Sequence, residues 1–304
     1  MDRGPRRGAV VAGCAVLVWF TLLAVAWLPR MLVHDQPGHR RRLLRALHRA
    51  SLMATQSMLQ LTLFFALPFY WHAATLDEPG HVLFMATLML LCAVTLWDPL
   101  TMRLLARPLL GALLPAAGSF VALCAVLPGL GFSTRTSLWL AAAAAGVGTV
   151  LVAVGVAPVD RRRDVTARAL LAVGVLGGAL VLGAARAVPA APLRLIDAEI
   201  GTQLSGKWLA DPTRQLAGLP ERLICATAIW SPLGVHDRLF HVWRKDGVLR
   251  ARIKLEIRGG RGQGYRTNSR IQNLGRNGQG VYRCTVETEN GQVLGGANLR
   301  VGGP

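Results

Sequence analysis

Residues 138–158 read LWLAAAAAGVGTVLVAVGVAP, an apolar run with no charged side chain. A helix needs about 20 mostly apolar residues to cross the hydrocarbon core of a bilayer. Helices of soluble proteins keep one polar face, and this run has none. The stretch therefore predicts a membrane-spanning helix, and it decides the fold class of the N-terminal half.

The same pattern recurs along residues 1–188 and predicts an α-helical integral membrane domain of about six spans. The expected spans are Gly8–Leu28, Ser51–Ala74, His81–Trp97, Leu109–Leu130, Ser137–Pro158 and Ala169–Val188. Composition agrees, because only 16% of the residues are charged, against roughly 25% in an average soluble domain. For the first segment there is an alternative. A basic start followed by an apolar run and Ala24-Val25-Ala26 also suits a cleaved signal peptide.

Arginine is distributed unevenly among the expected loops. Loops 29–50, 98–108 and 159–168 together hold 12 arginines, whereas loops 75–80 and 131–136 hold one. Cytoplasmic loops carry an excess of Lys and Arg. The count predicts a multi-pass membrane protein whose C-terminal domain is extracytoplasmic. Arginines beside a span can also contact anionic lipid headgroups, and the candidates are Arg40, Arg41, Arg42, Arg45 and Arg49.

Few polar residues interrupt the expected spans. Gln56 and Gln60 are one helical turn apart and share a face. We expect them to hydrogen-bond between helices, and a substrate path is the alternative. Gly174 and Gly178 form a GxxxG pattern, which packs helices within one chain or between copies of a homo-oligomer.

The soluble part follows residue 188. Residues 189–220 are expected to be a linker, partly helical or irregular. Residues 221–304 carry short alternating runs separated by turn residues, notably Lys245-Asp246-Gly247 and Glu289-Asn290-Gly291. Such residues accept the positive φ of tight hairpins. The pattern predicts a small all-β antiparallel, sandwich-like domain.

Basic residues mark one strand of this domain and the segment after it. In Leu249–Ile257, apolar residues alternate with Arg250, Arg252 and Lys254. Next comes GGRGQGYRTNSR at 259–270, which fits neither GxGxxG nor GxxxxGK[ST] and is interpreted as a flexible turn. Outside the membrane we expect no nucleic acid, but an anionic lipid, an acidic polymer or a protein partner. The candidate contact residues are Arg250, Arg252, Lys254, Arg258, Arg261, Arg266 and Arg270.

Two cysteines, Cys225 and Cys284, lie in separate expected strands. Outside the cytoplasm they can form a disulfide, and two buried thiols are the alternative. His236 and His241 show no arrangement of a base with an orienting group. The sequence yields no catalytic, cofactor or metal-binding candidates, so we expect a protein that is not an enzyme.

The C-terminal order of motifs also carries a resemblance. VWRKDG at 242–247, YRTNSR at 265–270, GVYRCTV at 280–286 and NGQVLG at 290–295 stand in the order of a bacterial domain of unknown function, number 2914. The resemblance covers roughly residues 220–302. Attachment to a multi-spanning half is similar to an uncharacterised family of bacterial membrane proteins. The resemblance implies a β-domain attached to a multi-pass protein of the bacterial inner (cytoplasmic) membrane, and it implies no activity.

These features leave three hypotheses for function. The first is a membrane-anchored protein whose β-domain binds an anionic or protein partner at the cell envelope. The second is a transporter or channel-like subunit with an accessory β-domain, which needs polar groups at membrane depth. The third is an enzyme of envelope lipid or polysaccharide metabolism, for which only His72, Asp77, Glu78 and His81 come near one another in sequence.

Overall fold

The computed structural model describes residues 39–157, 159–181, 184–191, 193–206, 208–231, 237–255, 260–275 and 278–302. The chain divides into two compact units. The helical unit comprises Met1–Phe69, Met85–Leu127 and Thr136–Ala184. The β-unit comprises Ala185–Pro304 together with two short segments from the helical half, Tyr70–Phe84 and Pro128–Arg135.

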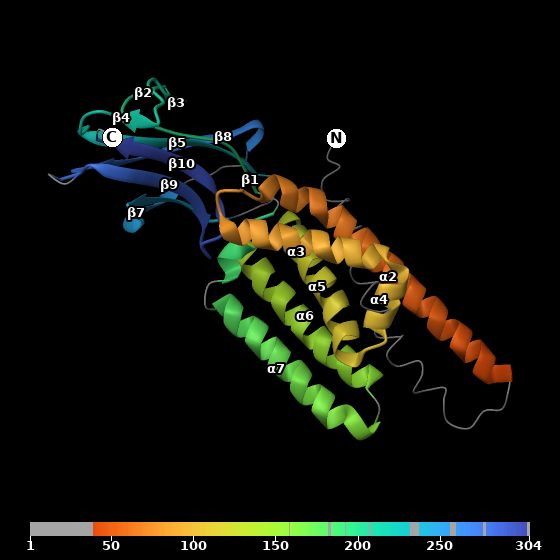
Figure 1. Cartoon of the computed structure of the whole chain (residues 1–304). Coiled ribbons are helices and arrows are strands. Elements are labelled where there is room, and N and C mark those ends of the chain that lie inside the picture. Colours follow the sequence, from red (N-terminus) through yellow and green to blue (C-terminus); the bar gives the residue numbers. More distant parts are fainter. Residues whose placement is uncertain are drawn as a thin grey trace. The chain divides into compact units, whose positions relative to one another are not determined.

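Within the described residues, six α-helices precede the strands (Figure 1). They are α2 (His39–Ala73), α3 (Pro79–Leu96), α4 (Asp98–Leu105), α5 (Pro108–Val126), α6 (Thr134–Val156) and α7 (Arg162–Val181), with short 3-10 turns η1 (Leu127–Leu130), η2 (Val159–Arg161) and η3 (Ala184–Ala187). In the part of the chain that the structure describes, four segments are long and apolar enough to cross a membrane: Leu52–Ala73, Pro79–Leu96, Pro108–Leu130 and Thr134–Gly155. They coincide with the second to fifth expected spans.

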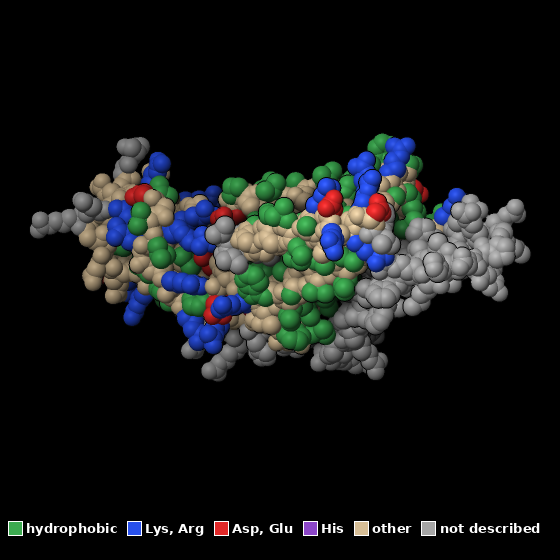
Figure 2. All heavy atoms as spheres, turned by 90° about the horizontal axis from the view of Figure 1, so that it is seen from below, with side chains coloured by type: hydrophobic (Ala, Val, Ile, Leu, Met, Phe, Trp, Pro, Cys, Tyr) green, Lys and Arg blue, Asp and Glu red, His purple; other side chains and the backbone are tan. Residues whose placement is uncertain are grey.

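The expected number of six spans is not recovered. Gly8–Leu28 lies outside the described residues. The sixth expected span falls on α7, whose first two turns carry charged residues and which is not among the four apolar segments. In the helical unit, Figure 2 shows Lys and Arg gathered at one end of the helices, with apolar side chains along their length.

Small residues let the helices pack closely. Ala112 of α5, Val152 and Ala153 of α6, and Ala169 of α7 form one buried cluster. A Cβ built on Gly146 would lie 3.0 Å from the Val173 side chain, so this glycine gives α7 room against α6. Gly174 and Gly178 instead face open space. Within the described chain, the GxxxG pattern therefore joins no pair of helices.

Gln56 and Gln60 close the break between α3 and α4, as expected for residues that hydrogen-bond between helices. Both amides donate to the carbonyl of Thr95, at 3.2 Å from Gln56 Nε2, and Gln56 also donates to the Asp98 carboxylate. Helix ends leave carbonyls without intrahelical partners, and such groups are costly to bury unpaired. The two amides supply that partner here.

The strands form two main sheets. The three-stranded sheet has the order β1 (Arg194–Gly201), β5 (Arg222–Ser231), β8 (Gly260–Gln272). The five-stranded sheet has the order β4 (Gln215–Leu216), β10 (Val293–Val301), β9 (Gly280–Thr288), β6 (Leu239–Lys245), β7 (Val248–Leu255), and β2 (Leu204–Ser205) pairs with β3 (Trp208–Leu209). Pairing is antiparallel except between β4 and β10, where the expected antiparallel arrangement is wrong.

The two sheets pack face to face. Leu223 and Cys225 of β5 and Trp243, Tyr282 and Cys284 of the five-stranded sheet belong to one buried cluster. Alternation along each strand sends these side chains inward and their neighbours outward. Burial of a large apolar side chain stabilises a fold by about 1.5–3 kcal/mol. This shared core therefore holds the two layers together as a sandwich.

Two expectations for the β-unit are wrong. Residues 189–220 are not a partly helical or irregular linker, because β1 pairs with β5 from Arg194 to Gly201 and β2, β3 and β4 follow. Residues 259–270 are not a flexible turn, because β8 begins at Gly260 and pairs with β5. Gly264 has φ of 81° and would place a Cβ 3.1 Å from the Ile229 backbone. The glycines of β8 therefore permit an irregular strand rather than a loop.

The β6–β7 hairpin has the tight turn that the sequence predicts. Asp246 and Gly247 both have positive φ, 47° and 81°. A two-residue turn of this kind needs positive φ at both positions, which a β-branched residue resists. Nothing lies within 4 Å of a Cβ built on Gly247. Any cost of substitution there would come from the backbone and not from a clash.

We expect Gly247→Val to lower the free energy of unfolding by about 1–3 kcal/mol, since it forces a β-branched residue into the left-handed region. Chemical unfolding of the purified full chain measures this. The control is Gly218→Val, because Gly218 is exposed and also has open space around its Cβ position but no positive φ. Equal losses for the two variants would contradict the assignment of strain to Gly247.

Candidate functional site

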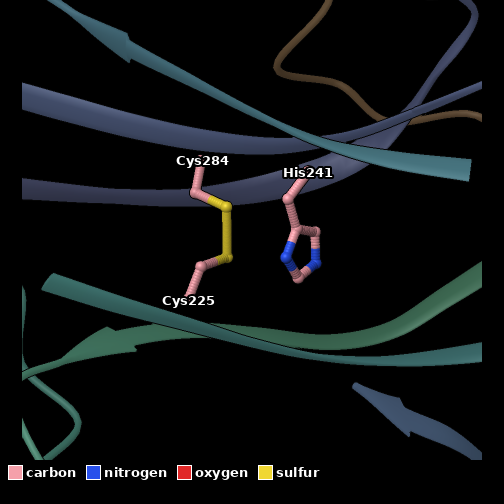
Figure 3. Close-up of side chains that lie close together, drawn as sticks. All are labelled: Cys225, His241 and Cys284. Carbon is pink, nitrogen blue, oxygen red and sulfur yellow. A yellow bond between two sulfur atoms is a disulfide. The ribbon is translucent and has the colours of Figure 1, made fainter. Parts of the chain in front are cut away.

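A disulfide lies at the centre of the β-unit. It joins Cys225 of β5 to Cys284 of β9, whose Cα atoms are 6.4 Å apart, and it runs between the two sheets (Figure 3). Both cysteines are fully buried. A bridge across a sequence separation of 59 residues constrains the unfolded chain and is worth about 2–4 kcal/mol. It links β5 of one sheet covalently to β9 of the other.

His241 of β6 lies beside the bridge (Figure 3) and is fully buried. Its Nε2 is 2.8 Å from Thr227 Oγ1, and its Nδ1 is 2.7 Å from Ser269 Oγ. Trp243 donates from Nε1 to the same Ser269 oxygen at 3.0 Å. Ser269 can thus donate its own proton to Nδ1, and a neutral imidazole with its proton on Nε2 satisfies every member.

The same residues resemble a metal-binding group in composition only. One ligand atom each from Cys225, Cys284 and His241 lie within 4.8 Å of one another. Zinc, however, binds thiolates, and these sulfurs are joined to each other. Both ring nitrogens of His241 are also engaged by hydroxyl groups. The arrangement therefore fits a hydrogen-bonded core better than a metal site.

Two segments from between the helices contact the sandwich within the β-unit. Glu78, from the segment before α3, accepts a hydrogen bond from Arg283 of β9 at 2.6 Å. Asp237, just before β6, accepts at 2.7 Å from the backbone N–H of Thr134 and at 3.0 Å from its hydroxyl. Thr134 is the first residue of α6, so Asp237 caps that helix as an N-cap side chain would. Neither contact has a local signal in the sequence.

The candidate partner-binding residues do not form one surface. On β7, Arg252 and Lys254 are opposite Val242 and Phe240 and lie on the outer face of the five-stranded sheet. The guanidinium of Arg252 stacks over Phe240 at 4.1 Å. A register shift between Trp243 and Arg244 leaves Arg250 out of the alternation, although it is exposed.

Arg266 and Arg270 of β8 lie on the outer face of the other sheet. They are opposite Ala228 and Ile224, whose side chains face away from the disulfide, and Arg266 lies over the Trp208 ring at 5.3 Å. Of the other candidates, Arg258 is outside the described residues. The backbone of Arg261 belongs to β8 and its side chain is not described. The loop arginines expected at lipid headgroups lie in α2, where Arg49 is exposed and the side chains of Arg40, Arg41, Arg42 and Arg45 are not described.

A cavity of about 580 Å³ opens in the β-unit between β1 and β10. Three acidic residues line it, Asp77, Asp197 and Glu199, together with Arg214. The Glu199 carboxylate accepts a hydrogen bond from Trp208 Nε1 at 2.9 Å. The cavity could not be found from sequence, because its lining comes from four separate segments.

Two protein families, both of unknown function, match the chain. The family of unknown function DUF5924 matches residues 1–222, which include every described helix and β1. The chain belongs to family DUF5924. The protein of unknown function DUF2914 matches residues 236–301, which confirms the resemblance seen in the C-terminal motifs. No curated protein and no solved structure matches the chain.

The boundary between the two matches has a structural meaning. The DUF5924 match ends where β5 begins, so it includes β1, whereas the DUF2914 match includes β6 to β10. Because β1 and β8 both pair with β5 in one sheet, the sandwich of this DUF5924 protein needs strands from both matched regions. The two regions therefore do not correspond to two independent structural units.

Burial of His241 makes stability of this DUF5924 protein depend on pH. Burial lowers the pKa of His241 from 6.5 to about 4. Between these values the unfolded state binds a proton that the folded state does not. The free energy of unfolding should therefore fall as pH drops from about 6.5 toward 4, by up to about 3 kcal/mol.

We expect His241→Gln to remove this part of the pH dependence, although the variant is less stable at pH 7. Chemical unfolding of the purified chain over that pH range, for the wild type and the variant, measures the difference. His72→Gln, at an exposed histidine, is the matched control and should keep the wild-type slope. An unchanged slope in His241→Gln would show that other groups control the acid sensitivity.

Proposed function

We propose that this DUF5924 chain is a multi-pass protein of the bacterial inner membrane whose β-unit lies outside the cytoplasm and binds an acidic protein partner there. The observation that carries the binding part is strand β7. Among the described strands it has a hydrogen-bonded neighbour only on the β6 side, and it combines exposed apolar and basic side chains along its other edge. The second binding candidate, an acidic polymer, is an outcome of the test below.

The contacts of the β-unit support the proposed topology. Glu78 precedes α3 and Thr134 begins α6, and both contact the sandwich. The C-terminal unit must then lie on the same side of the bilayer as the segments that hold these two residues. From Thr134 the chain passes through α6 and α7 before it reaches β1. The contacts therefore fit only if α7 crosses the bilayer as well.

The length and surface of α7 allow such a crossing. Its 20 residues extend about 30 Å at 1.5 Å per residue, close to the hydrocarbon thickness. Leu170, Leu171, Val175 and Leu176 are all more than half exposed, as lipid-facing residues are. The charged residues are confined to its first two turns. In this proposal they lie at the cytoplasmic surface, in agreement with the positive-inside rule.

Exposed tryptophans support bilayer placement from the other helices. Trp71 is near the end of α2, Trp97 follows α3, and Trp139 is near the start of α6, and their exposed fractions are 64%, 65% and 41%. Tryptophan is enriched where the hydrocarbon meets the headgroups. Positions near helix ends fit that preference, whereas a soluble protein would rarely expose several such rings.

The free edge of β7 suits a strand-forming partner. Val248 and Leu249 are 64% and 58% exposed. Arg250 and Lys254 are exposed, and neither forms an ion pair within the described part of the chain. An extended segment can add to such an edge by main-chain hydrogen bonds, while side chains provide specificity. Basic side chains at the edge favour an acidic segment.

The topology has a direct test by reporter fusion. We expect a periplasmic reporter joined after residue 304 to be active and a cytoplasmic reporter there to be inactive, because the β-unit is proposed to be extracytoplasmic. Fusion after Asp160, between α6 and α7, is the matched control and should give the reverse result. A cytoplasmic reporter that is active at residue 304 would overturn the topology.

We expect the double variant Arg250→Gln/Lys254→Gln to bind a poly-glutamate peptide more weakly by about 0.5–2 kcal/mol, since each exposed charge pair contributes up to about 1 kcal/mol. Binding of the purified full chain at two salt concentrations measures this, and the loss should be smaller at high salt. Arg266→Gln/Arg270→Gln changes the net charge equally on the opposite face and should bind like the wild type.

A larger loss of poly-glutamate affinity in the Arg266→Gln/Arg270→Gln variant would show that the binding site lies on the three-stranded sheet. To separate a strand partner from a polymer, a photo-crosslinking residue is placed at Leu249 in cells, with exposed Leu219 as control. A protein adduct at position 249 that Arg250→Gln/Lys254→Gln removes supports a protein partner. Binding of acidic polysaccharide with no adduct at either position would favour the polymer.

A further inference from the structure

A second cavity, of about 510 Å³, lies in the helical unit where α5 and α7 begin. Three arginines line it, Arg107, Arg161 and Arg168, with a single carboxylate, Asp164. The rest of the lining is apolar and consists of Pro108, Leu109, Leu110 and Val165. A pocket of this kind combines excess positive charge with a hydrocarbon-like wall.

The positive charge of this pocket is largely uncompensated. Arg107 and Arg168 are exposed, and within the described residues neither takes part in an ion pair or a side-chain hydrogen bond. Arg161 pairs with Asp160 at 3.9 Å only, where both side chains are 76% exposed. Asp164 supplies one negative charge against three positive charges. The electrostatic complement of the pocket is therefore an anion.

The backbone adds donors at the same place. Helix α5 begins at Pro108, and its N-cap residue Arg107 makes no side-chain capping bond. The first N–H groups of a helix point outward and carry partial positive charge. They favour an anionic group near Arg107, although alone they would not define a site.

The apolar wall continues into the lipid-facing surface. Leu110 is 37% exposed at the start of the apolar segment Pro108–Leu130, and Leu170 and Leu171 of α7 are 55% and 68% exposed further along. A molecule bound at the arginines would therefore extend along apolar side chains in the direction of the bilayer core. That combination of one anionic end and one hydrocarbon end describes a phospholipid.

We propose that the pocket between the starts of α5 and α7 binds an anionic phospholipid, with its phosphate at Arg107 and Arg168 and its acyl chains along Leu110 and Val165. The inference rests on the proposed function only in that the helices span a bilayer. It requires no particular side for the β-unit and no partner at β7. Basic pockets between membrane helices hold acidic headgroups in this way.

The test uses the delipidated full chain in detergent and native mass spectrometry with phosphatidylglycerol or phosphatidylcholine of identical acyl chains. The wild type should bind phosphatidylglycerol at least about tenfold more tightly than phosphatidylcholine. Arg107→Gln/Arg168→Gln should lose roughly 30-fold in affinity for phosphatidylglycerol, at about one tenfold step per 1.4 kcal/mol and about 1 kcal/mol per arginine. Arg103→Gln/Arg163→Gln removes two exposed arginines of the same unit that do not line the pocket and should bind normally.

A second variant keeps the test valid if the double variant fails to fold. Asp164→Asn removes the only carboxylate of the pocket and should strengthen binding of phosphatidylglycerol. Unchanged binding in both pocket variants, or equal loss in the Arg103/Arg163 control, would overturn the proposal. Displacement of the lipid by soluble glycerol phosphate at equal concentration would also overturn it, because the acyl chains would then contribute nothing. Reporter fusions at residue 304 test the topology separately, so the two failures are distinguishable.

Discussion

The hydrogen bonds from Thr134 to Asp237 and from Arg283 to Glu78 constrain the structure more than their energies suggest. A helix N-cap contributes about 1 kcal/mol and a partly exposed ion pair less than that. Yet each joins the β-sandwich to a segment of the β-unit that comes, in the sequence, from between two helices. In the proposed membrane topology, both partners of such a contact must lie on one side of the bilayer. The number of crossings between them must then be even, which limits the course of α7 more strictly than its hydropathy does.

The β-unit meets a different constraint, since polar groups at its centre must be satisfied without water. Thr227, His241, Ser269 and Trp243 come from three strands and two sheets, and each has a partner within the group. A network of this kind is favourable only when it is complete. The disulfide beside it holds β5 and β9 at a fixed separation. The bridge therefore preserves the geometry on which the hydrogen bonds depend.

Patterns confined to one segment could be predicted from the sequence, and contacts between segments could not. Apolar runs predicted α3, α5 and α6, and the Asp246-Gly247 turn predicted the β6–β7 hairpin. Strand β1 was missed because its alternation is weak and its structure comes from pairing with β5. The glycines of 259–270 predict a turn because glycine lowers strand propensity. Pairing along β5 overrides that preference.

The distribution of arginine shows why charge counting alone could not define a site. A basic composition predicted one anion-binding surface on the β-unit, but alternation divides Arg252 and Lys254 from Arg266 and Arg270 onto opposite faces. The arginines of loops 98–108 and 159–168 were assigned only to topology. Folding brings Arg107 and Arg168 to one cavity with an apolar wall. An arginine that orients a helix in the proposed topology can thus also bind a lipid in the proposed pocket. Orientation depends only on the side of the membrane on which the arginine lies, whereas lipid binding depends on the side chains that surround it.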